Sequence, residues 1–517
     1  MSTQWWRDAV IYQVYPRSFA DSDGDGMGDL PGIRSRLPYL RDLGVDAVWL
    51  SPFYASPQAD GGYDVTDYRV VDPMFGTVAD AEALIRDAHD LGLRVIVDIV
   101  PNHSSERHDW FRRARADGPG SAARKRYHFR RGLGATGDRP PNDWPSLFGG
   151  PAWTRVSDGE WYLHLFAPEQ PDFNWEHPAV ADEFRSVLRF WLDLGADGFR
   201  VDVAHGLVKA AGLPDLGGGA NPCFDQDGVH DIYRTWRDIL DEYPGERIAV
   251  AEAWAPTLGR VANYVRDDEL HQAFNFLYLA AAWEAGTQRR VITESIEVMA
   301  AVGAPATWTL SNHDVPRHHT RLMQVVAGEV AGRRAEPVDS VAALRRARAA
   351  TLLMLALPGS AYLYQGEELG LPEVVDLPAE VRQDPAFHRA AGQDGYRDGC
   401  RVPLPWSGTS PPYGFGPGSS WLPQPPEWAK LSVAAQEGVP GSTLELYRRA
   451  LALRRGLTGD LVWLPAAPGV LAFRRDGHEC IVNMSDGPVP LDGSVLLASG
   501  PTDGGLLPPD TTIWRSR

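Results

Sequence analysis

The sequence contains few cysteines and no long apolar run. Its three cysteines, Cys223, Cys400 and Cys480, are odd in number and far apart, and their spacing matches no metal or redox motif. Isolated thiols of this kind are typical of a reducing compartment. No stretch approaches the ~20 consecutive apolar residues that cross a bilayer, and residues 1–8 lack the basic segment and apolar core of a secretion signal. We therefore expect a cytoplasmic protein without a membrane span.

Positive charge is also in deficit. The chain has 50 Lys and Arg residues against 68 Asp and Glu residues, which gives a net charge of −18. Nucleic acids and anionic membranes are bound by cationic surfaces, so this balance disfavours both as partners. The basic clusters at 112–115 and 124–131 are better explained as solvated surface. We expect a monomer or small homo-oligomer that acts on a small neutral molecule.

Short apolar runs alternate with helical patterns along most of the chain. The runs are rich in aliphatic, β-branched and aromatic residues, as is typical of parallel strands buried on both faces. They lie at 10–15, 47–50, 94–100, 198–202, 248–252, 273–276, 309–314 and 360–364. Strand and helix alternating in this way predict an α/β fold of the (β/α)8 TIM-barrel type rather than an open doubly wound sheet.

Two segments depart from this alternation. After the third predicted strand, residues 104–170 form a stretch with Gly, Pro and aromatic residues that is too long for a simple loop and predicts a small inserted domain. Beyond an irregular segment at 398–441 and a helical stretch at 442–455, short β-like runs predict a C-terminal antiparallel β domain. We therefore divide the chain into a barrel (1–103 and 171–440), an inserted domain (104–170) and a C-terminal domain (441–517).

Carboxylates stand at the ends of three predicted strands: Asp202, Glu252 and Asp314. Barrel enzymes hold their catalytic residues at this end of the strands. Arg200 and Asp202 point the same way because they alternate on one strand, and the guanidinium should lower the pKa of Asp202 and keep it ionised. Glu252 follows an apolar strand, a setting that favours its protonated form. An ionised nucleophile beside a protonated acid is what glycoside cleavage requires.

Further polar side chains follow the third and seventh predicted strands. Asp98 lies near the end of the third predicted strand and His103 follows that strand. His313 precedes Asp314 at the end of the seventh. Carboxylates and imidazoles can bond neighbouring hydroxyls of a neutral sugar. A zinc site would need closely spaced histidines on one helix, which the sequence lacks. These residues therefore favour a hydroxyl-rich ligand.

Together these motifs resemble the α-glucosidases of the α-amylase family (glycoside hydrolase family 13), close to the bacterial oligo-1,6-glucosidase and maltase group. The resemblance covers about residues 5–406 and rests on DIVPNH (98–103), QPDFNW (170–175), GFRVD (198–202), AEAW (251–254) and LSNHD (310–314). It implies that Asp202 is the nucleophile, that Glu252 is the acid/base and that Asp314 stabilises the distorted sugar ring. It also implies that the same subsite is lined by Asp98, His103, Arg200 and His313.

The resemblance also favours an exo-acting enzyme over an open-cleft amylase. In the family's exo-glucosidases, an acid and a tyrosine after the second strand and an arginine after the eighth close the pocket around the terminal glucose. By resemblance, Asp60 pairs with Arg401 and Tyr63 is a stacking platform. Phe148 and Phe166 resemble the aromatics at the pocket's mouth. Without the resemblance, Asp60 would be interpreted as a turn residue, and the two phenylalanines could equally form the core of the inserted domain.

A segment after the first predicted strand is rich in aspartate and glycine. Oxygen ligands at alternating positions follow the logic of calcium loops, although Gly32 stands where an EF-hand requires glutamate. The resemblance implies a structural Ca²⁺ or Mg²⁺ there, away from the catalytic centre, and no organic cofactor; a solvated turn is the alternative. The candidate ligands are Asp21, Asp23, Asp25, the backbone carbonyl of Met27, and Asp29.

The bond that would be cleaved is less well specified. In related enzymes, valine after the nucleophile accompanies α-1,6 preference and threonine α-1,4 preference, so Val203 favours α-1,6. Ala204 and His205 depart from the continuation common in oligo-1,6-glucosidases, and a pocket wall discriminates by only ~1–3 kcal/mol. We expect an exo-acting retaining α-glucosidase for maltose- or isomaltose-type sugars, with a covalent glucosyl intermediate and some transglucosylation.

Two alternatives remain at this stage. A glucosyltransferase or isomerase on the same scaffold, such as a trehalose or isomaltulose synthase, shares the covalent step and differs in whether water or a sugar hydroxyl resolves it. A catalytically silent relative, like the heavy chains that escort amino-acid transporters, is disfavoured. Such proteins carry a membrane span and have lost the carboxylates, whereas this sequence has no such span and keeps all three.

Overall fold

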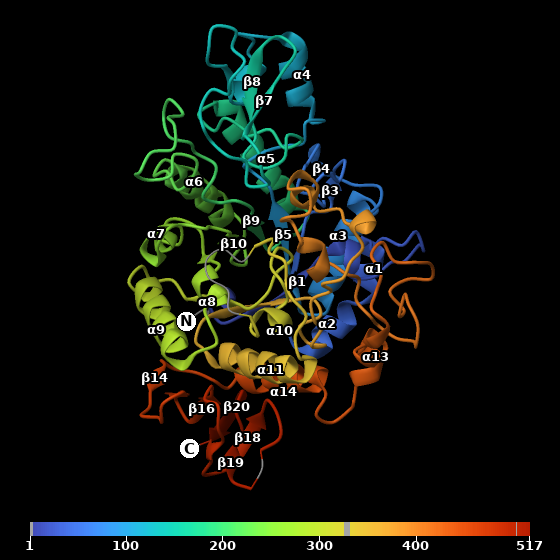
Figure 1. Cartoon of the computed structure of the whole chain (residues 1–517), viewed down its shortest axis with the longest axis vertical. Coiled ribbons are helices and arrows are strands. Elements are labelled where there is room, and N and C mark those ends of the chain that lie inside the picture. The colour runs from blue at the N-terminus through green and yellow to red at the C-terminus, as the bar shows by residue number, and fades with distance from the viewer. Residues whose placement is uncertain (1–3, 325–330, 503, 517) are drawn as a thin grey trace.

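The centre of the molecule is a parallel eight-stranded sheet surrounded by helices, in a computed structural model that describes residues 4–324, 331–502 and 504–516 (Figure 1). Neighbouring strands are hydrogen-bonded in the order β11-β10-β9-β5-β2-β1-β13-β12. The Asn275 N–H donates to the Thr307 carbonyl at 3.1 Å, and this bond joins the two ends of that order into a barrel. The eight strands are β1 (Val10–Val14), β2 (Ala47–Leu50), β5 (Arg94–Ile99), β9 (Gly198–Val201), β10 (Ile248–Ala251), β11 (Gln272–Ala273), β12 (Thr307–Thr309) and β13 (Ser360–Tyr364). The predicted TIM barrel is confirmed.

Two of the predicted strands end earlier than their apolar runs suggest. The run at 273–276 leaves the sheet after Ala273, because the Asn275 side chain accepts the Tyr278 N–H at 3.0 Å and caps α8 (Phe276–Ala280). β12 ends at Thr309, and Asn312 Oδ1 then accepts the Asp314 N–H at 2.8 Å. In both places an asparagine side-chain oxygen accepts a backbone N–H, and such local hydrogen bonds compete with those of a strand. Asp314 therefore stands on a loop above the strand end.

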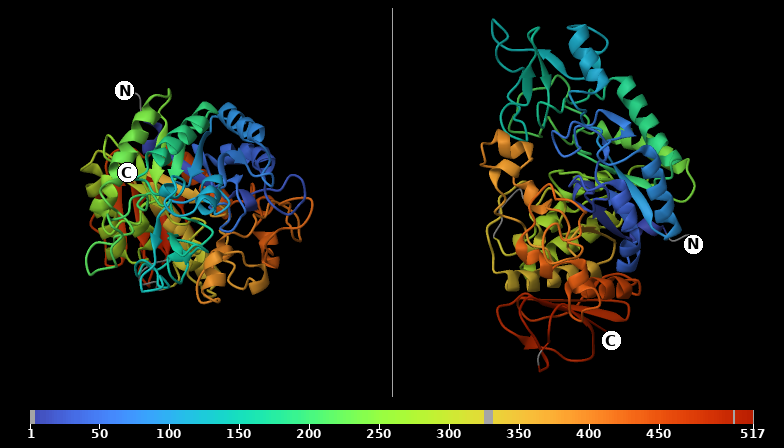
Figure 2. Two further views of the ribbon diagram at one scale, coloured as in Figure 1. Left: turned by 90° about the horizontal axis from the view of Figure 1, so that it is seen from above. Right: turned by 90° about the vertical axis from the view of Figure 1, so that its right-hand side faces the viewer.

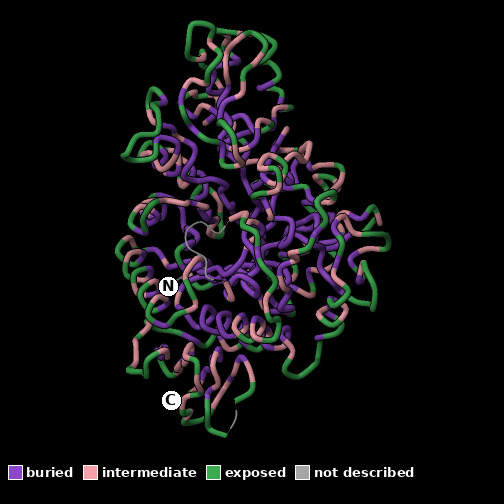
Figure 3. The backbone as a smooth tube through the Cα atoms, viewed as in Figure 1, coloured by how far each residue is buried: buried purple, intermediate pink, exposed green. Residues whose placement is uncertain are grey.

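Helices cover the outer face of the barrel, and their buried residues face the strands (Figure 3). α3 is a clear example: Thr77 and Asp80 form a reciprocal capping box at its start, and only one side of the helix is buried. The covering helices are α1 (Leu30–Ser35), α2 (Leu37–Leu43), α3 (Val78–Asp90), α5 (Pro178–Asp193), α6 (Val229–Asp241), α7 (Leu258–Asn263), α9 (Ala285–Ala300), α10 (His318–Arg321) and α11 (Ser340–Ala356). A hairpin of β3 (Tyr54–Ala55) and β4 (Asp67–Val71) follows β2.

The segment between β5 and α5 projects from one end of the barrel (Figures 1 and 2). It contains α4 (Asp109–Asp117) and an antiparallel sheet of β6 (Phe129–Arg131), β8 (Glu160–Leu163) and β7 (Trp153–Arg155). Buried Trp144 and Trp153 lie at the centre of its small apolar cluster. Isolated bridges such as His103–Asp172 join its base to the barrel.

The C-terminal strands lie at the opposite end of the long axis (Figure 2). An antiparallel sheet contains β14 (Val462–Trp463), β15 (Val470–Arg475), β16 (His478–Asn483), β20 (Thr511–Ser516) and β18 (Val495–Ala498), and β17 (Val489–Pro490) pairs with β19 (Leu506–Leu507). The sheet packs on α11, where Trp514 donates its indole N–H to the Leu352 carbonyl at 3.1 Å. α14 (Thr443–Arg454) lies beside α11 between barrel and sheet (Figure 1).

The described residues include no helix that is long and apolar enough to cross a membrane. All three cysteines are buried and free.

A buried lysine joins the inserted segment to the barrel. The Lys209 ammonium donates to Asn102 Oδ1 at 2.7 Å and to the Gly206 carbonyl, and it lies 2.8 Å from Asp172 Oδ2. The side chains of Lys209 and Asp172 are 1% and 0% exposed. Asn102 follows β5, Asp172 comes just after the inserted segment and Gly206 follows β9, so one cation connects three parts of the chain.

Replacing Lys209 by methionine should therefore destabilise the protein strongly. The substitution keeps most of the apolar stem but leaves the Asp172 carboxylate buried without its charge partner, a loss that costs about 3–5 kcal/mol. The expected result is a large fall in the urea midpoint measured by intrinsic fluorescence. Lys430→Met, the same change at an exposed lysine, is the control. Equal midpoints for the two variants would contradict this role.

Candidate active site

A cavity of about 640 Å³ opens at the carboxyl ends of the barrel strands. Residues from the barrel loops and from the inserted segment both contribute to its wall. Nine of the side chains predicted from the sequence line it: Asp60, Tyr63, His103, Phe148, Phe166, Asp202, Val203, Glu252 and Asp314. The remaining four predicted residues, Asp98, Arg200, His313 and Arg401, are almost fully buried directly behind that lining.

One guanidinium joins three carboxylates at the floor of the cavity. Arg200 Nη1 lies 3.0 Å from Asp98 Oδ1 and 2.6 Å from Asp202 Oδ1, and Nη2 lies 2.6 Å from Glu252 Oε2. Arg200 and Asp202 belong to β9 and its end, Asp98 to the neighbouring β5, and Glu252 follows β10. The carboxylates of Asp202 and Glu252 are therefore separated by no more than one guanidinium group.

The electrostatics of this cluster differ from the sequence prediction. Burial, with the nearby charges of Glu252 and Asp98, raises the pKa of Asp202 above its usual range although Arg200 opposes the shift. Burial likewise raises the pKa of Asp98 to about 7 against the effect of Arg200. The predicted lowering for Asp202 is thus wrong, because three carboxylates share one positive charge. Burial therefore favours the protonated forms of Asp98 and Asp202, and the Arg200 charge opposes that effect.

The predicted apolar setting of Glu252 is also wrong. Its carboxylate contacts Arg200, accepts the Val203 backbone N–H at 3.1 Å through Oε2, and accepts the Trp254 indole N–H at 3.3 Å through Oε1. The apolar residues of β10 face the core, whereas the carboxylate follows the strand end into the cavity. Val203 reaches Glu252 with φ of +44°, a left-handed conformation that is costly for a β-branched residue.

Asp314 lies in a separate cationic environment. Its Oδ1 is 2.9 Å from Arg401 Nη2 and 3.3 Å from Arg397 Nη1, and His313 Nε2 is 3.3 Å from Oδ2. Burial acts to raise the pKa of Asp314, but His313 and the two arginines lower it well below its usual range. Asp314 is therefore ionised across the whole neutral range.

The partner predicted for Asp60 is wrong. Asp60 Oδ1 pairs with Arg397 Nη2 at 2.8 Å, while Arg401 is turned inward, where it bonds the His313 carbonyl and Asp314 and lies over the Tyr15 ring. Arg397 is the first residue of the 3-10 turn Arg397–Cys400 and Arg401 follows that turn, so the two side chains point in different directions. Only Arg397 of the two lines the cavity. A charge pair of Asp60 does line the cavity, but its partner is the arginine four residues before the predicted one.

Aromatic and polar side chains complete the closed end of the cavity. Tyr63 is stacked on His313 at 5.3 Å with an interplanar angle of 7°, and its hydroxyl donates to Asp98 Oδ2 at 3.1 Å. His103 Nε2 lies 3.1 Å from Gln170 Nε2, and that amide also donates to Asp60 at 3.2 Å. The polar groups therefore form one connected network around the cavity floor.

Phe148 and Phe166 come from the inserted segment and contact each other edge to face at 5.4 Å. Phe148 lies under the Arg397 guanidinium at 4.8 Å, and Phe166 contacts His103 at 5.1 Å. Phe166 also packs against the apolar cluster of the inserted segment, so it serves both roles considered from the sequence.

Several residues of the site were not identified from the sequence. Gln170 and Trp254 belong to the QPDFNW and AEAW motifs, and Arg397 lies four residues before the predicted Arg401. Each therefore had a nearby signal in the sequence. His205 and Phe224 also line the cavity. No sequence pattern indicated Phe224, which is brought in by a long loop after β9.

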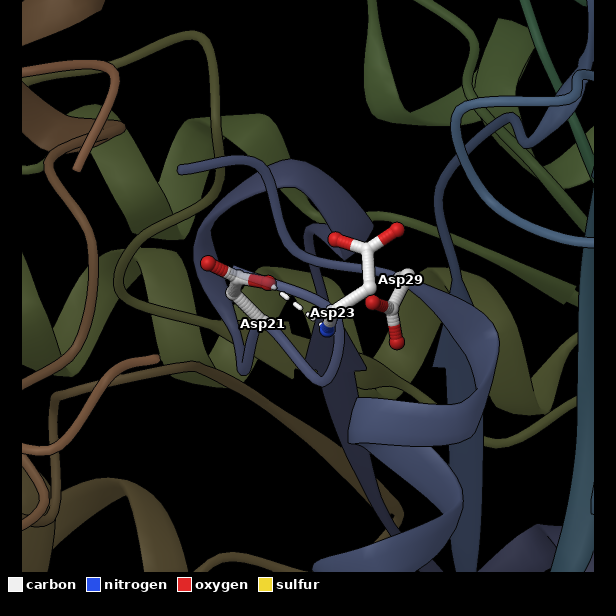
Figure 4. A group of neighbouring side chains, drawn as sticks. All are labelled: Asp21, Asp23 and Asp29. Carbon is white, nitrogen blue, oxygen red and sulfur yellow. Dashed lines mark hydrogen bonds between the residues drawn. The ribbon is translucent and has the colours of Figure 1, made fainter. Parts of the chain in front are cut away.

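The aspartate-rich loop after β1 brings three carboxylates together. Ligand oxygens of Asp21, Asp23 and Asp29 lie within 4.8 Å of one another (Figure 4). Asp21 Oδ1 accepts the Asp23 N–H at 3.1 Å, and glycines with φ near +90° at 24 and 26 allow the tight turn. Asp25 lies outside the group, and its Oδ1 accepts the Met27 N–H at 2.7 Å. Three hard oxygen donors fit Ca²⁺ or Mg²⁺.

Comparison with known proteins agrees with this geometry. Residues 13–458 match the family described as alpha amylase, catalytic domain. The chain is 38% identical to a probable alpha-glucosidase of Rhizobium meliloti (strain 1021), over 93% of this chain and 90% of the relative. It is 33% identical to the oligo-1,6-glucosidase of Parageobacillus thermoglucosidasius, over 88% and 84% of the two chains.

A solved structure resembles the whole molecule. The crystal structure of the alpha-glucosyl transfer enzyme XgtA superposes with a TM-score of 0.85 at 34% identity, and the match covers 99% of each chain.

Proposed function

Because this chain belongs to the α-amylase family and is a glycoside hydrolase, we propose that it is an exo-acting, retaining α-glucosidase. It would release the terminal glucose from short α-linked oligosaccharides such as maltose or isomaltose. The observation that carries this proposal is the attachment of Asp202 and Glu252 to one guanidinium in the cavity at the carboxyl ends of the strands.

The contact of both the Asp202 and the Glu252 carboxylate with Arg200 keeps these two groups close together, which supports a double displacement. Retaining glycosidases have carboxyl groups about 5–5.5 Å apart, whereas inverting enzymes need a wider gap for water. In the first step an Asp202 oxygen attacks the anomeric carbon, the glycosidic C–O bond breaks, and Glu252 gives its proton to the leaving oxygen. In the second step Glu252 takes a proton from water, whose oxygen displaces Asp202 and releases glucose.

We assign the acid role to Glu252 by its position. Its side chain is 13% exposed, against 7% for Asp202 and 0% for Asp98, so it can reach both the leaving oxygen and water. Asp314, kept ionised by Arg397 and Arg401, would stabilise the positive charge that develops on the sugar ring.

The closed end of the cavity supports exo action. The Asp60–Arg397 pair and the stacked rings of Tyr63 and His313 lie at that end and would block the chain beyond one sugar unit. Phe148 and Phe166 would narrow the cavity on the side where the inserted segment forms its wall. A substrate would therefore enter with its non-reducing end first.

Glucosyl transfer is the second candidate, and the similarity to the alpha-glucosyl transfer enzyme XgtA favours it. Both reactions share the glucosyl-Asp202 intermediate and differ in whether water or a sugar hydroxyl attacks it. An isomerase of the trehalose or isomaltulose synthase type would return the released sugar to the same intermediate.

We also propose a structural Ca²⁺ or Mg²⁺ on the loop after β1, held by Asp21, Asp23 and Asp29 with further oxygens of that loop. The convergence of three carboxylates supports it, since like charges repel unless a cation lies among them. The ion would fix the loop that precedes α1.

The catalytic assignment predicts that two amide variants respond differently to the leaving group. Glu252→Gln should lower kcat/KM, which reports the first step, by about 10²–10⁴-fold for maltose but much less for an aryl α-glucoside, because a phenolate leaves without protonation. Asp202→Asn should abolish turnover of both substrates. Steady-state rates of the purified variants, with circular dichroism to verify folding, decide the matter. Equal slowing of both substrates by Glu252→Gln would remove its acid role.

Product analysis separates hydrolysis from transfer. With maltose or isomaltose as the substrate, an α-glucosidase releases two glucose molecules per bond, and at high substrate concentration some new oligosaccharide forms as well. Chromatography of the products over time should give glucose as the main product below about 1 mM substrate, in the range of ordinary KM values. A disaccharide isomer as the main product, with little free glucose, would instead identify an isomerase.

Metal removal should lower stability rather than the rate of each folded molecule. Saturating Ca²⁺ or Mg²⁺ at about 100 times its Kd would add about 2.7 kcal/mol, so the thermal midpoint should rise after metal is restored to chelator-treated protein. Asp23→Asn should weaken this response, and Asp486→Asn, at an exposed site between β16 and β17, should leave it unchanged. An identical midpoint with chelator and with either metal would refute the site.

A further inference from the structure

A second cavity lies at the opposite end of the barrel, where the amino ends of the first strands meet the C-terminal sheet. Its volume is about 290 Å³. The residues before β1 and β2, the end of α14 and the end of β15 form its wall, so it joins segments that are distant in the sequence. Its charged lining consists of Asp8, Asp46, Arg454, Arg455 and Arg475. The reaction proposed above uses none of these residues.

Two of the three arginines are buried charges with no carboxylate in contact. Arg454 and Arg475 are each only 6% exposed, and neither lies within 4.0 Å of a carboxylate oxygen in the described part of the chain. An ion pair at the cavity joins the exposed Arg455 to Asp46 at 3.7 Å instead. Arginines are almost never fully buried unless they are paired, so two such groups at one cavity indicate that a negative charge is missing there.

Backbone carbonyls satisfy part of each guanidinium. Arg454 and Arg475 make five hydrogen bonds to carbonyls, four of them at residues 355–359, where α11 ends. A guanidinium has five N–H donors, so half of the donors on these two groups have no partner among the described residues. They include the accessible Nη2 of Arg475 and the enclosed Nε of Arg454. The end of a helix carries about half a negative charge, which is less than the charge of two guanidiniums.

The two aspartates of the cavity bind backbone rather than these arginines. Asp46 Oδ2 accepts the Val10 N–H at 2.8 Å, and Asp8 Oδ1 accepts the Gly359 N–H at 3.3 Å. They offset some positive charge at a distance, yet burial and the Arg475 charge still lower the pKa of Arg454 to about 10. Arg454 is therefore protonated at pH 7, and an anion in the cavity would stabilise its charge.

We propose that this cavity binds a phosphate group, either as inorganic phosphate or as part of a small phosphorylated metabolite. A phosphate monoester carries a charge of about −1.5 to −2 at pH 7, which matches the two guanidiniums that lack a carboxylate. Guanidiniums bind phosphate oxygens through parallel N–H donors. Trp5 and Leu457 also line the cavity, and their side chains would pack against an organic substituent. The bound group would hold the C-terminal sheet to the barrel.

Isothermal titration calorimetry of the whole protein tests this site with two probes, inorganic phosphate and glycerol 3-phosphate. Both should bind with a Kd below about 1 mM, the upper end of ordinary metabolite affinities. Arg475→Gln retains an amide donor for the carbonyls but removes the charge, so both Kd values should rise about 10–100-fold.

Two further variants make the test independent of burial. Arg455→Glu reverses the charge of an exposed cavity residue and should raise both Kd values by at least about tenfold. Arg449→Glu, the same substitution at an exposed position of α14 outside the cavity, should leave them unchanged. Circular dichroism verifies that each variant is folded.

Each outcome decides the question. Loss of binding in Arg475→Gln with retention in Arg449→Glu supports the site. A lower Kd for glycerol 3-phosphate than for inorganic phosphate then identifies an organic phosphate as the ligand, and an equal or higher one identifies free phosphate. No binding to the wild-type protein, unchanged binding in Arg475→Gln, or an equal loss in Arg449→Glu overturns the proposal. Should Arg475→Gln fail to fold, Arg455→Glu must show the loss or the site is rejected. Glucose release from maltose is a separate measurement, so failure of this site would not affect the proposed function.

Discussion

The arrangement of this site depends on one buried guanidinium. Burying the Arg200 charge in the barrel without carboxylate partners would cost desolvation free energy. Without Arg200, the carboxylates of Asp98, Asp202 and Glu252 would repel one another. Together they fix the relative heights of β5, β9 and β10, the three neighbouring strands from which these residues come. The same contacts hold the two proposed catalytic groups one guanidinium apart.

Ionic contacts between distant loops hold together the part of the cavity wall that contains Asp60 and Asp314. Arg397 alone joins Asp60, Asp314 and Asp384, from loops after the second, seventh and eighth barrel strands. A chain with a net charge of −18 thus concentrates its arginines where carboxylates gather. The pocket is closed by charge pairs between barrel loops, and the inserted segment adds aromatic side chains to one wall.

Local backbone strain connects the two proposed catalytic residues. Val203, at φ +44°, turns its N–H toward Glu252 immediately after Asp202. Strain of this kind persists only where the surroundings impose it. The same turn leads into His205, which lines the cavity. One short segment after β9 therefore carries the nucleophile, a hydrogen bond to the acid/base and part of the cavity wall.

The sequence by itself determined the barrel and most of the residues that line its cavity. Parallel strands are continuous apolar runs, and the carboxylates that follow them must emerge at the same end, so Asp202, Glu252 and Asp314 could be identified locally. Only the tertiary structure decided which charges meet. Arg397 rather than Arg401 pairs with Asp60 because a 3-10 turn sets their directions. Glu252 lies in an ionic rather than an apolar setting because Arg200 approaches from the adjacent strand. Phe224 reaches the cavity through a loop whose path depends on contacts with distant residues, and such contacts leave no local pattern in the sequence.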